Sequence, residues 1–135
     1  MVMIMALSVF AAATHEKIPL FANIIFPLLL VGFGEEILYR GYVQSRLNQA
    51  FSRKFSLYGV KFGWGMIITA ALFAVVHPLG ALNPDYWPWA VWTFASGLVF
   101  GYLREMTGSI VAPSIAHCFP EVIAFIFGGL GKSFD

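Results

Sequence analysis

The sequence VGFGEEILYRGY, residues 31–42, places two glutamates and an arginine inside a stretch of otherwise apolar chain. Such a stretch is expected in lipid, where ionised side chains are costly and normally persist only with partners and a function. Two histidines, His77 and His117, lie in two later apolar segments. Carboxylates and imidazoles buried in a membrane are suited to proton transfer. We therefore predict a membrane-embedded helical bundle that contains a buried acid–imidazole site.

Composition supports this fold class. Of the 135 residues, 59% are hydrophobic and 11% are charged, whereas soluble domains carry about a quarter charged residues. We expect an all-α integral membrane bundle of about four to five helices, which forms a single domain over residues 1–135. A net charge of +1 without a basic stripe argues against a nucleic-acid partner. The single cysteine excludes an internal disulfide.

Four longer helices are predicted, over about 18–48, 64–77, 87–105 and 110–127. Pro27 is expected to kink the first helix, and Pro78 to end the second. Residues 80–85 should form a loop, and residues 107–109 a tight turn. The apolar segment 1–13 is shorter than the about 20 residues that a spanning helix needs. We interpret it as the end of a hydrophobic helix, in a chain that is trimmed or naturally short.

Charged and aromatic residues orient the predicted bundle. The connection between the first two helices is basic and carries no acid; its cations are Arg46, Arg53, Lys54 and Lys61. By the positive-inside rule this connection is cytoplasmic, in a multi-pass protein of a bacterial or archaeal cell membrane. The opposite side should carry an interfacial aromatic belt, formed by Trp87, Trp89 and Trp92.

Helix geometry divides the candidate site residues into two groups. At a rise of about 1.5 Å per residue, Glu35, His77 and His117 reach similar depths on three helices and are expected to meet in one site. Glu36 and Arg40 are spaced i,i+4, which favours a structural ion pair. Glu35 lacks that counter-ion, and a carboxylate moved out of water becomes a stronger base. We therefore predict that Glu35 is a general base acting on water.

The segment around His117 has two further features. Pro120 follows three residues later and frees the backbone carbonyl of Ala116, which suggests a locally opened helix beside the imidazole. Glu121 is spaced i,i+4 from His117, so both side chains share one face. The Gly97–Gly101 pair, a small-xxx-small pattern, is interpreted as helix packing.

The order of these motifs resembles that of the CPBP membrane proteins. The matching residues are the run Glu35–Arg40, then Phe73 with His77, then the glycine-rich helix that leads through Arg104–Ser109 to His117. Together the motifs cover residues 34–121. The family comprises CAAX prenyl endopeptidases and bacteriocin-processing or immunity proteins, also called Abi proteins. It is helical and embedded in the membrane, and the resemblance implies an intramembrane endopeptidase.

The resemblance also implies residue roles. Glu35 would activate water, and His77 would orient that water or share its proton. His117 would stabilise the oxyanion of the tetrahedral intermediate, together with the residue four positions later. Glu36 and Arg40 would brace the site. The substrate would be a peptide or protein, prenylated or plain.

The chain departs from the family pattern in two respects. The family commonly has Asn four residues after the last histidine, where this chain has Glu121. An amide donates to an oxyanion, whereas an ionised carboxylate repels it. The family also usually has more helices, so N-terminal helices could be missing from this chain.

Three alternatives to the glutamate mechanism stay open on the sequence alone. The glutamate mechanism requires no cofactor. A catalytic zinc needs three protein ligands and a water, and the chain offers enough ligands for one: Glu35, His77, His117 and Glu121. Cys118 could act as a nucleophile served by His77. The chain could also be a non-catalytic membrane protein that binds a peptide or bacteriocin, as an immunity or scaffold factor.

Overall fold

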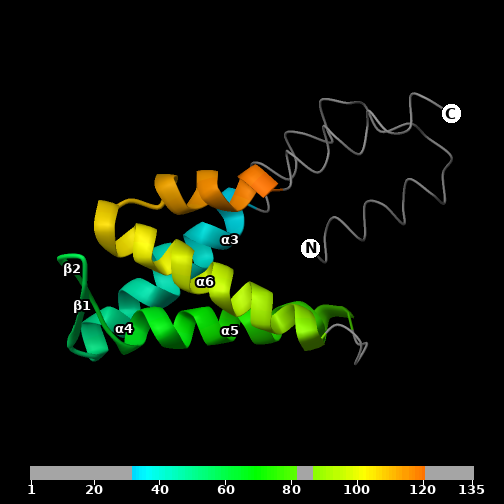
Figure 1. Ribbon diagram of the computed structural model, residues 1–135, viewed down its shortest axis with the longest axis horizontal. Coiled ribbons are helices and arrows are strands. Elements are labelled where there is room, and N and C mark those ends of the chain that lie inside the picture. Colours follow the sequence, from blue (N-terminus) through cyan, green and yellow to red (C-terminus); the bar gives the residue numbers. More distant parts are fainter. Residues whose placement is uncertain (1–31, 82–86, 121–135) are drawn as a thin grey trace, which may run out of the picture.

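The computed structural model describes residues 32–81 and 87–120, and these are mostly helical, as predicted (Figure 1). The chain is helical without interruption over residues 32–50. This first helix contains α3 (Gly34–Glu36), the π-helix η2 (Ile37–Gln44) and α4 (Ser45–Ala50). Two long helices follow, α5 (Trp64–Ala81) and α6 (Trp87–Thr107). Residues 111–120 form the last described helix.

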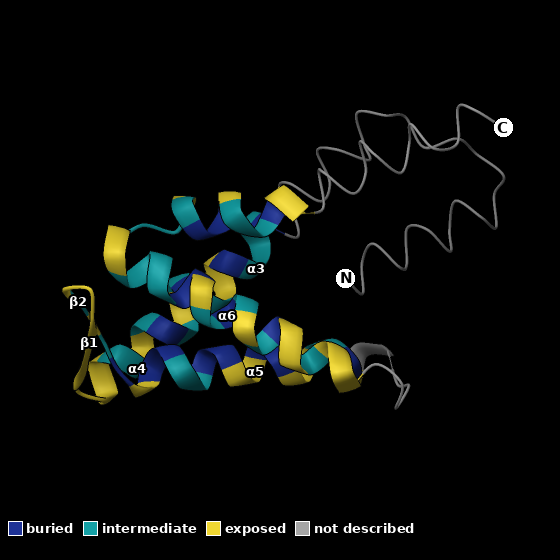
Figure 2. Cartoon of the chain, viewed as in Figure 1, coloured by how far each residue is buried: buried dark blue, intermediate teal, exposed yellow. Residues whose placement is uncertain are grey.

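The helices are layered around α6. In Figure 1, α6 runs between α5 and the helix of residues 111–120, and α3 lies beside that last helix. The π-helix η2 contacts both α5 and α6, while α4 packs against α5. The first helix therefore crosses the bundle from the last helix to the N-terminal end of α5. In Figure 2, buried segments (dark blue) lie where the helices pass one another.

Two glycines let α5 and α6 approach closely. A Cβ atom at Gly97 would lie 3.2 Å from the Cα of Ala70, and one at Gly101 would lie 2.6 Å from the Cγ of Met66. Contacts this short leave no room for a side chain. The packing role expected for the Gly97–Gly101 pattern is confirmed.

The π-helix keeps a polar stripe on one face of the first helix. Glu36, Arg40 and Gln44 are all fully buried and are spaced four residues apart. In an α-helix, residues four apart drift around the axis by about 40° per step, so a long stripe turns away from its neighbour. The wider turn of a π-helix opposes this drift. Arg40 and Gln44 donate hydrogen bonds to the carbonyls of Gly97 and Gly101 in α6, and Glu36 bonds to Arg40 and to His117 on the last helix.

A two-stranded hairpin adds to the predicted helices. Strands β1 (Phe55–Leu57) and β2 (Val60–Phe62) pair antiparallel within the connection after the first predicted helix, where no strand was predicted. Tyr58 and Gly59 form the turn, with φ angles of 48° and 82°. Because side chains alternate along a strand, Phe55 and Phe62 share one face, and the ring of Phe55 lies 5.7 Å from that of Trp64 at the start of α5. This packing holds the hairpin on the bundle.

The end of α5 also differs from the prediction. The helix continues through Pro78 to Ala81 instead of stopping at His77. A proline removes only one backbone donor, and an apolar helix can continue past it when its remaining hydrogen bonds stay within the helix. The predicted turn at residues 107–109 is present, and Gly108 adopts a φ of 69° there. The predictions for residues 1–31, Asn83–Asp85 and Glu121 lie outside the described residues.

Large apolar side chains remain exposed on several helices, among them Leu72, Val75, Val99 and Phe119. In the part of the chain that the structure describes, no helix combines the length and apolar character needed to cross a bilayer. The membrane-spanning part of the fold prediction stays a prediction.

Candidate active site

The Glu36–Arg40 pair lies at the centre of the site. Nη1 of Arg40 lies 2.7 Å from Oε1 of Glu36, and both side chains have no solvent exposure. The ion pair predicted from the i,i+4 spacing is therefore confirmed. A buried ion pair is stable only where further contacts compensate for the lost hydration of both groups.

Arg40 has these further contacts. Its Nη2 donates a hydrogen bond to the backbone carbonyl of Gly97, at 3.1 Å. Its guanidinium also lies over two aromatic rings, 4.5 Å from the centre of Phe73 and 5.3 Å from that of Phe100. Cation–π contacts of this kind are stronger when they are shielded from water. Arg40 thus links the first helix to both α5 and α6.

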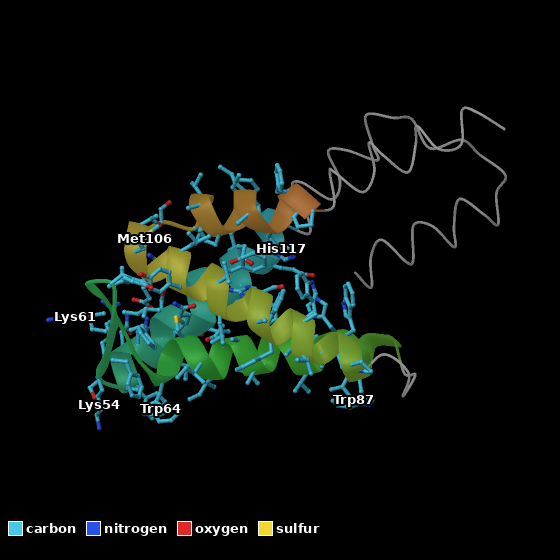
Figure 3. The ribbon with its side chains drawn as sticks, viewed as in Figure 1. Lys54, Lys61, Trp64, Trp87, Met106 and His117 are labelled. Atoms are coloured by element: carbon cyan, nitrogen blue, oxygen red, sulfur yellow. The ribbon has the colours of Figure 1, made fainter. Side chains whose placement is uncertain are left out.

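His117 lies between the two glutamates. Its Nδ1 lies 3.0 Å from Oε1 of Glu36, and its Nε2 lies 3.8 Å from Oε2 of Glu35. The imidazole stacks on Phe100, with the ring centres 5.0 Å apart and the planes at 21°. Figure 3 shows His117 reaching from the helix of residues 111–120 toward the interior. Because a carboxylate only accepts, Nδ1 donates its proton to Glu36 and Nε2 faces Glu35.

His77 joins the cluster through Phe73. Its Nδ1 lies 2.6 Å from the backbone carbonyl of Phe73, one turn earlier in α5. The ring of Phe73 lies 4.4 Å from that of His77 and 5.6 Å from that of His117, measured between ring centres. The structure thus brings His77 and His117, from two helices, to one buried phenylalanine, and Glu35 joins them through His117.

The two glutamates differ in exposure. The side chain of Glu36 is completely buried, whereas that of Glu35 is 26% exposed and that of His117 is 11% exposed. Glu35 and His117 therefore border space that a water or a substrate can reach, whereas Glu36 is enclosed. Glu121, the remaining predicted member, lies outside the described residues.

Phe73 and Phe100 are important parts of the site; from the sequence, Phe73 was named only as part of a family motif, without a role, and Phe100 was not singled out. Phe73 contacts both imidazoles and the guanidinium of Arg40, and the ring of Tyr39 packs edge-on against it at 5.1 Å. Its place one turn before His77 was a usable signal, since residues i and i+4 are neighbours on a helix. No comparable signal points to Phe100.

The zinc hypothesis was tested against this geometry. Within residues 32–81 and 87–120, no three His, Cys, Asp or Glu side chains are grouped closely enough to hold a metal ion. The Nδ1 atoms of His77 and His117 are bonded to a carbonyl and to Glu36, which leaves the Nε2 atoms as the nitrogens that could ligate a metal. Zinc dependence of the site stays a prediction, and so does a centre that includes Glu121.

These features define a class: a mostly helical protein with a buried acid–imidazole centre built from three helices. The chain belongs to the type II CAAX prenyl endopeptidase Rce1-like family, whose family model matches residues 17–123. This confirms the family assignment made from the motifs. Comparisons with curated proteins and with solved structures gave no match.

Proposed function

We propose that the chain is a membrane-embedded endopeptidase that hydrolyses a peptide bond with a water molecule activated by Glu35. One observation carries the proposal: Glu35, on the rim of the cluster, lies 3.8 Å from Nε2 of His117, while Glu36 beside it is committed to Arg40. Two adjacent glutamates thus have different environments, and only one of them borders accessible space. This difference favours Glu35 as the catalytic carboxylate.

His77 would hold the attacking water. Because the carbonyl of Phe73 can only accept, Nδ1 of His77 carries the proton of the neutral ring. Its Nε2 is then a hydrogen-bond acceptor, which can orient a water beside Glu35. Glu35 takes a proton from this water as the oxygen attacks the peptide carbonyl, and later delivers it to the leaving amine.

His117 would stabilise the oxyanion that forms on the peptide carbonyl. Both of its ring nitrogens are donors only in the imidazolium form. Glu36 accepts from Nδ1 and fixes the ring plane, which leaves Nε2–H to donate to the oxyanion. Glu36, held in turn by Arg40, would be a positioning residue.

The surface supports membrane embedding. Trp87, Trp89 and Trp92 at the start of α6 are all exposed, as expected of an interfacial belt. Figure 3 places Trp87 at the opposite end of the bundle from Lys54 and Lys61. Exposed apolar side chains on the helices between these ends are typical of a lipid-facing surface. The substrate is then a peptide presented at or within the bilayer.

The first experiment is a cleavage assay of the purified protein against matched peptides that differ only in a C-terminal prenyl group. Each peptide is tested with and without a chelator. Chelator-resistant cleavage supports the glutamate mechanism. Loss of cleavage with chelator, and its recovery with added zinc, would replace that mechanism with a metal-dependent one. The peptide preference identifies the substrate class.

Glu121 favours a second candidate, a non-catalytic peptide-binding protein, because a carboxylate at this position opposes an oxyanion. The test is Glu121→Asn. Activity in this variant, with none in the natural chain, would show that the natural chain binds peptides without cleaving them. Equal activity in both would reject the binding-only function.

A further inference from the structure

A polar cavity lies at the basic end of the bundle, away from the Glu35–His117 site. Its volume is about 250 Å³. Residues of α4, the connection after it and the end of α6 line it: Ser45, Asn48, Gln49, Arg53, Arg104 and Glu105. Lys54 and Lys61 lie at this same end in Figure 3. The proposed peptidase does not use these residues.

The only carboxylate that lines the cavity is already fully bonded. Oε1 of Glu105 accepts hydrogen bonds from the amides of Gln44 and Asn48, and Oε2 lies 3.4 Å from the guanidinium of Arg53. The side chain of Glu105 is only 3% exposed. Glu105 therefore acts as a structural link between α4 and α6, and its negative charge is partly offset by Arg53.

The cavity has hydrogen-bond donors to spare. Arg53 uses one edge of its guanidinium on Glu105, and its side chain is 52% exposed. Arg104 lines the cavity from the end of α6; its Nε is too deeply buried to reach a ligand, so its other N–H groups are the donors that it offers. The side-chain oxygen of Gln49 accepts a hydrogen bond from Arg46, so the NH₂ group of Gln49 points away from Arg46. Two arginines and one glutamate give the lining a formal charge of +1.

We propose that this cavity binds a phosphate group between Arg53 and Arg104. Two guanidinium groups from different elements can each present paired N–H donors, the geometry that phosphate oxygens accept best. A cationic ligand would be repelled by both arginines. At the basic end of a membrane-embedded bundle, the phosphate of an anionic lipid headgroup is the expected source. A free phosphate is the other source of the same chemistry.

The test measures lipid binding to the purified protein in detergent, by counting bound molecules with native mass spectrometry. The probes are phosphatidylglycerol and diacylglycerol, which lacks the phosphate, with inorganic phosphate as competitor. Phosphatidylglycerol should bind and diacylglycerol should not. Competition by inorganic phosphate at low concentration would identify a free phosphate as the natural ligand of the same site. Equal binding of both lipids would overturn the proposal.

Variants locate the site. Arg104→Gln should weaken phosphatidylglycerol binding about tenfold, the effect of losing one charge-assisted contact. Arg53→Gln should act similarly, and because this side chain is half exposed the variant should remain folded. The matched control is Lys61→Gln, which removes the same charge from the outer face of β2 and should change binding less than twofold. An equal loss in all three variants would show diffuse charge attraction and contradict a built site.

Discussion

Replacing Glu36 with Gln tests how the buried charges are held. The substitution keeps the shape of the side chain but removes its charge. Oε1 of Glu36 lies 2.7 Å from Arg40 and 3.0 Å from His117, and both Glu36 and Arg40 are fully buried. Arg40 would keep its hydrogen bond to Gly97 but lose Glu36, its one carboxylate partner among the described residues. Breaking a buried pair by neutralising one partner costs about 3–5 kcal/mol.

The assay is chemical denaturation of the purified protein, with the free energy of unfolding compared between variants. The matched control is Glu35→Gln, which makes the same chemical change one residue earlier. Because Glu35 is 26% exposed and lies 3.8 Å from His117, its loss should cost about 1 kcal/mol or less. The reasoning is refuted if Glu36→Gln costs no more than Glu35→Gln, since Arg40 would then not depend on that carboxylate.

Three further predictions test the packing and the turn. Gly97→Ala should destabilise by about 1–3 kcal/mol, because its Cβ would press on the α5 backbone. Gly32→Ala should also destabilise, since its Cβ would overlap Sγ of Cys118, and Cys118→Ala should rescue it. Tyr58→Asn should stabilise by about 1 kcal/mol, because Asn tolerates the positive φ of 48° better than Tyr. Denaturation of each variant measures these effects.

A specific result would contradict each of these predictions. The control for Gly97 is Gly41→Ala, whose Cβ would meet its nearest atoms at an ordinary 3.7 Å; an equal loss in both variants would mean that helix contact is not the cause. Additive losses for Gly32→Ala and Cys118→Ala would show that the two residues do not contact. An unstabilised Tyr58→Asn would show that the tyrosine ring makes a compensating contact.

Helical periodicity was sufficient to predict the parts of the fold that depend on local geometry. The Glu36–Arg40 pair and the glycine packing on α6 both follow from the spacing of residues on a helix. The hairpin was missed because each strand has only three residues, FSL and VKF. The alternation of apolar and polar residues on both sides of Tyr58 and Gly59 is a hairpin signal, but over three residues it is a weak one.

The site could be predicted only in part, because sequence spacing gives depth along a helix and not rotation about its axis. Depth grouped Glu35, His77 and His117, and in the structure both imidazoles contact Phe73 while Glu35 lies beside His117. It did not reveal that Nδ1 of His117 bonds to Glu36. That contact depends on how the π-helix turns the first helix relative to its neighbours, and π-helices have no simple sequence signature.

The cleavage rate of Glu35→Gln under single-turnover conditions tests the central claim most directly, on whichever peptide the wild-type protein cleaves. The variant should remain folded and lose at least about a hundredfold in rate, because an amide cannot take a proton from water. Cleavage at the wild-type rate by a folded Glu35→Gln protein would remove this carboxylate from the reaction.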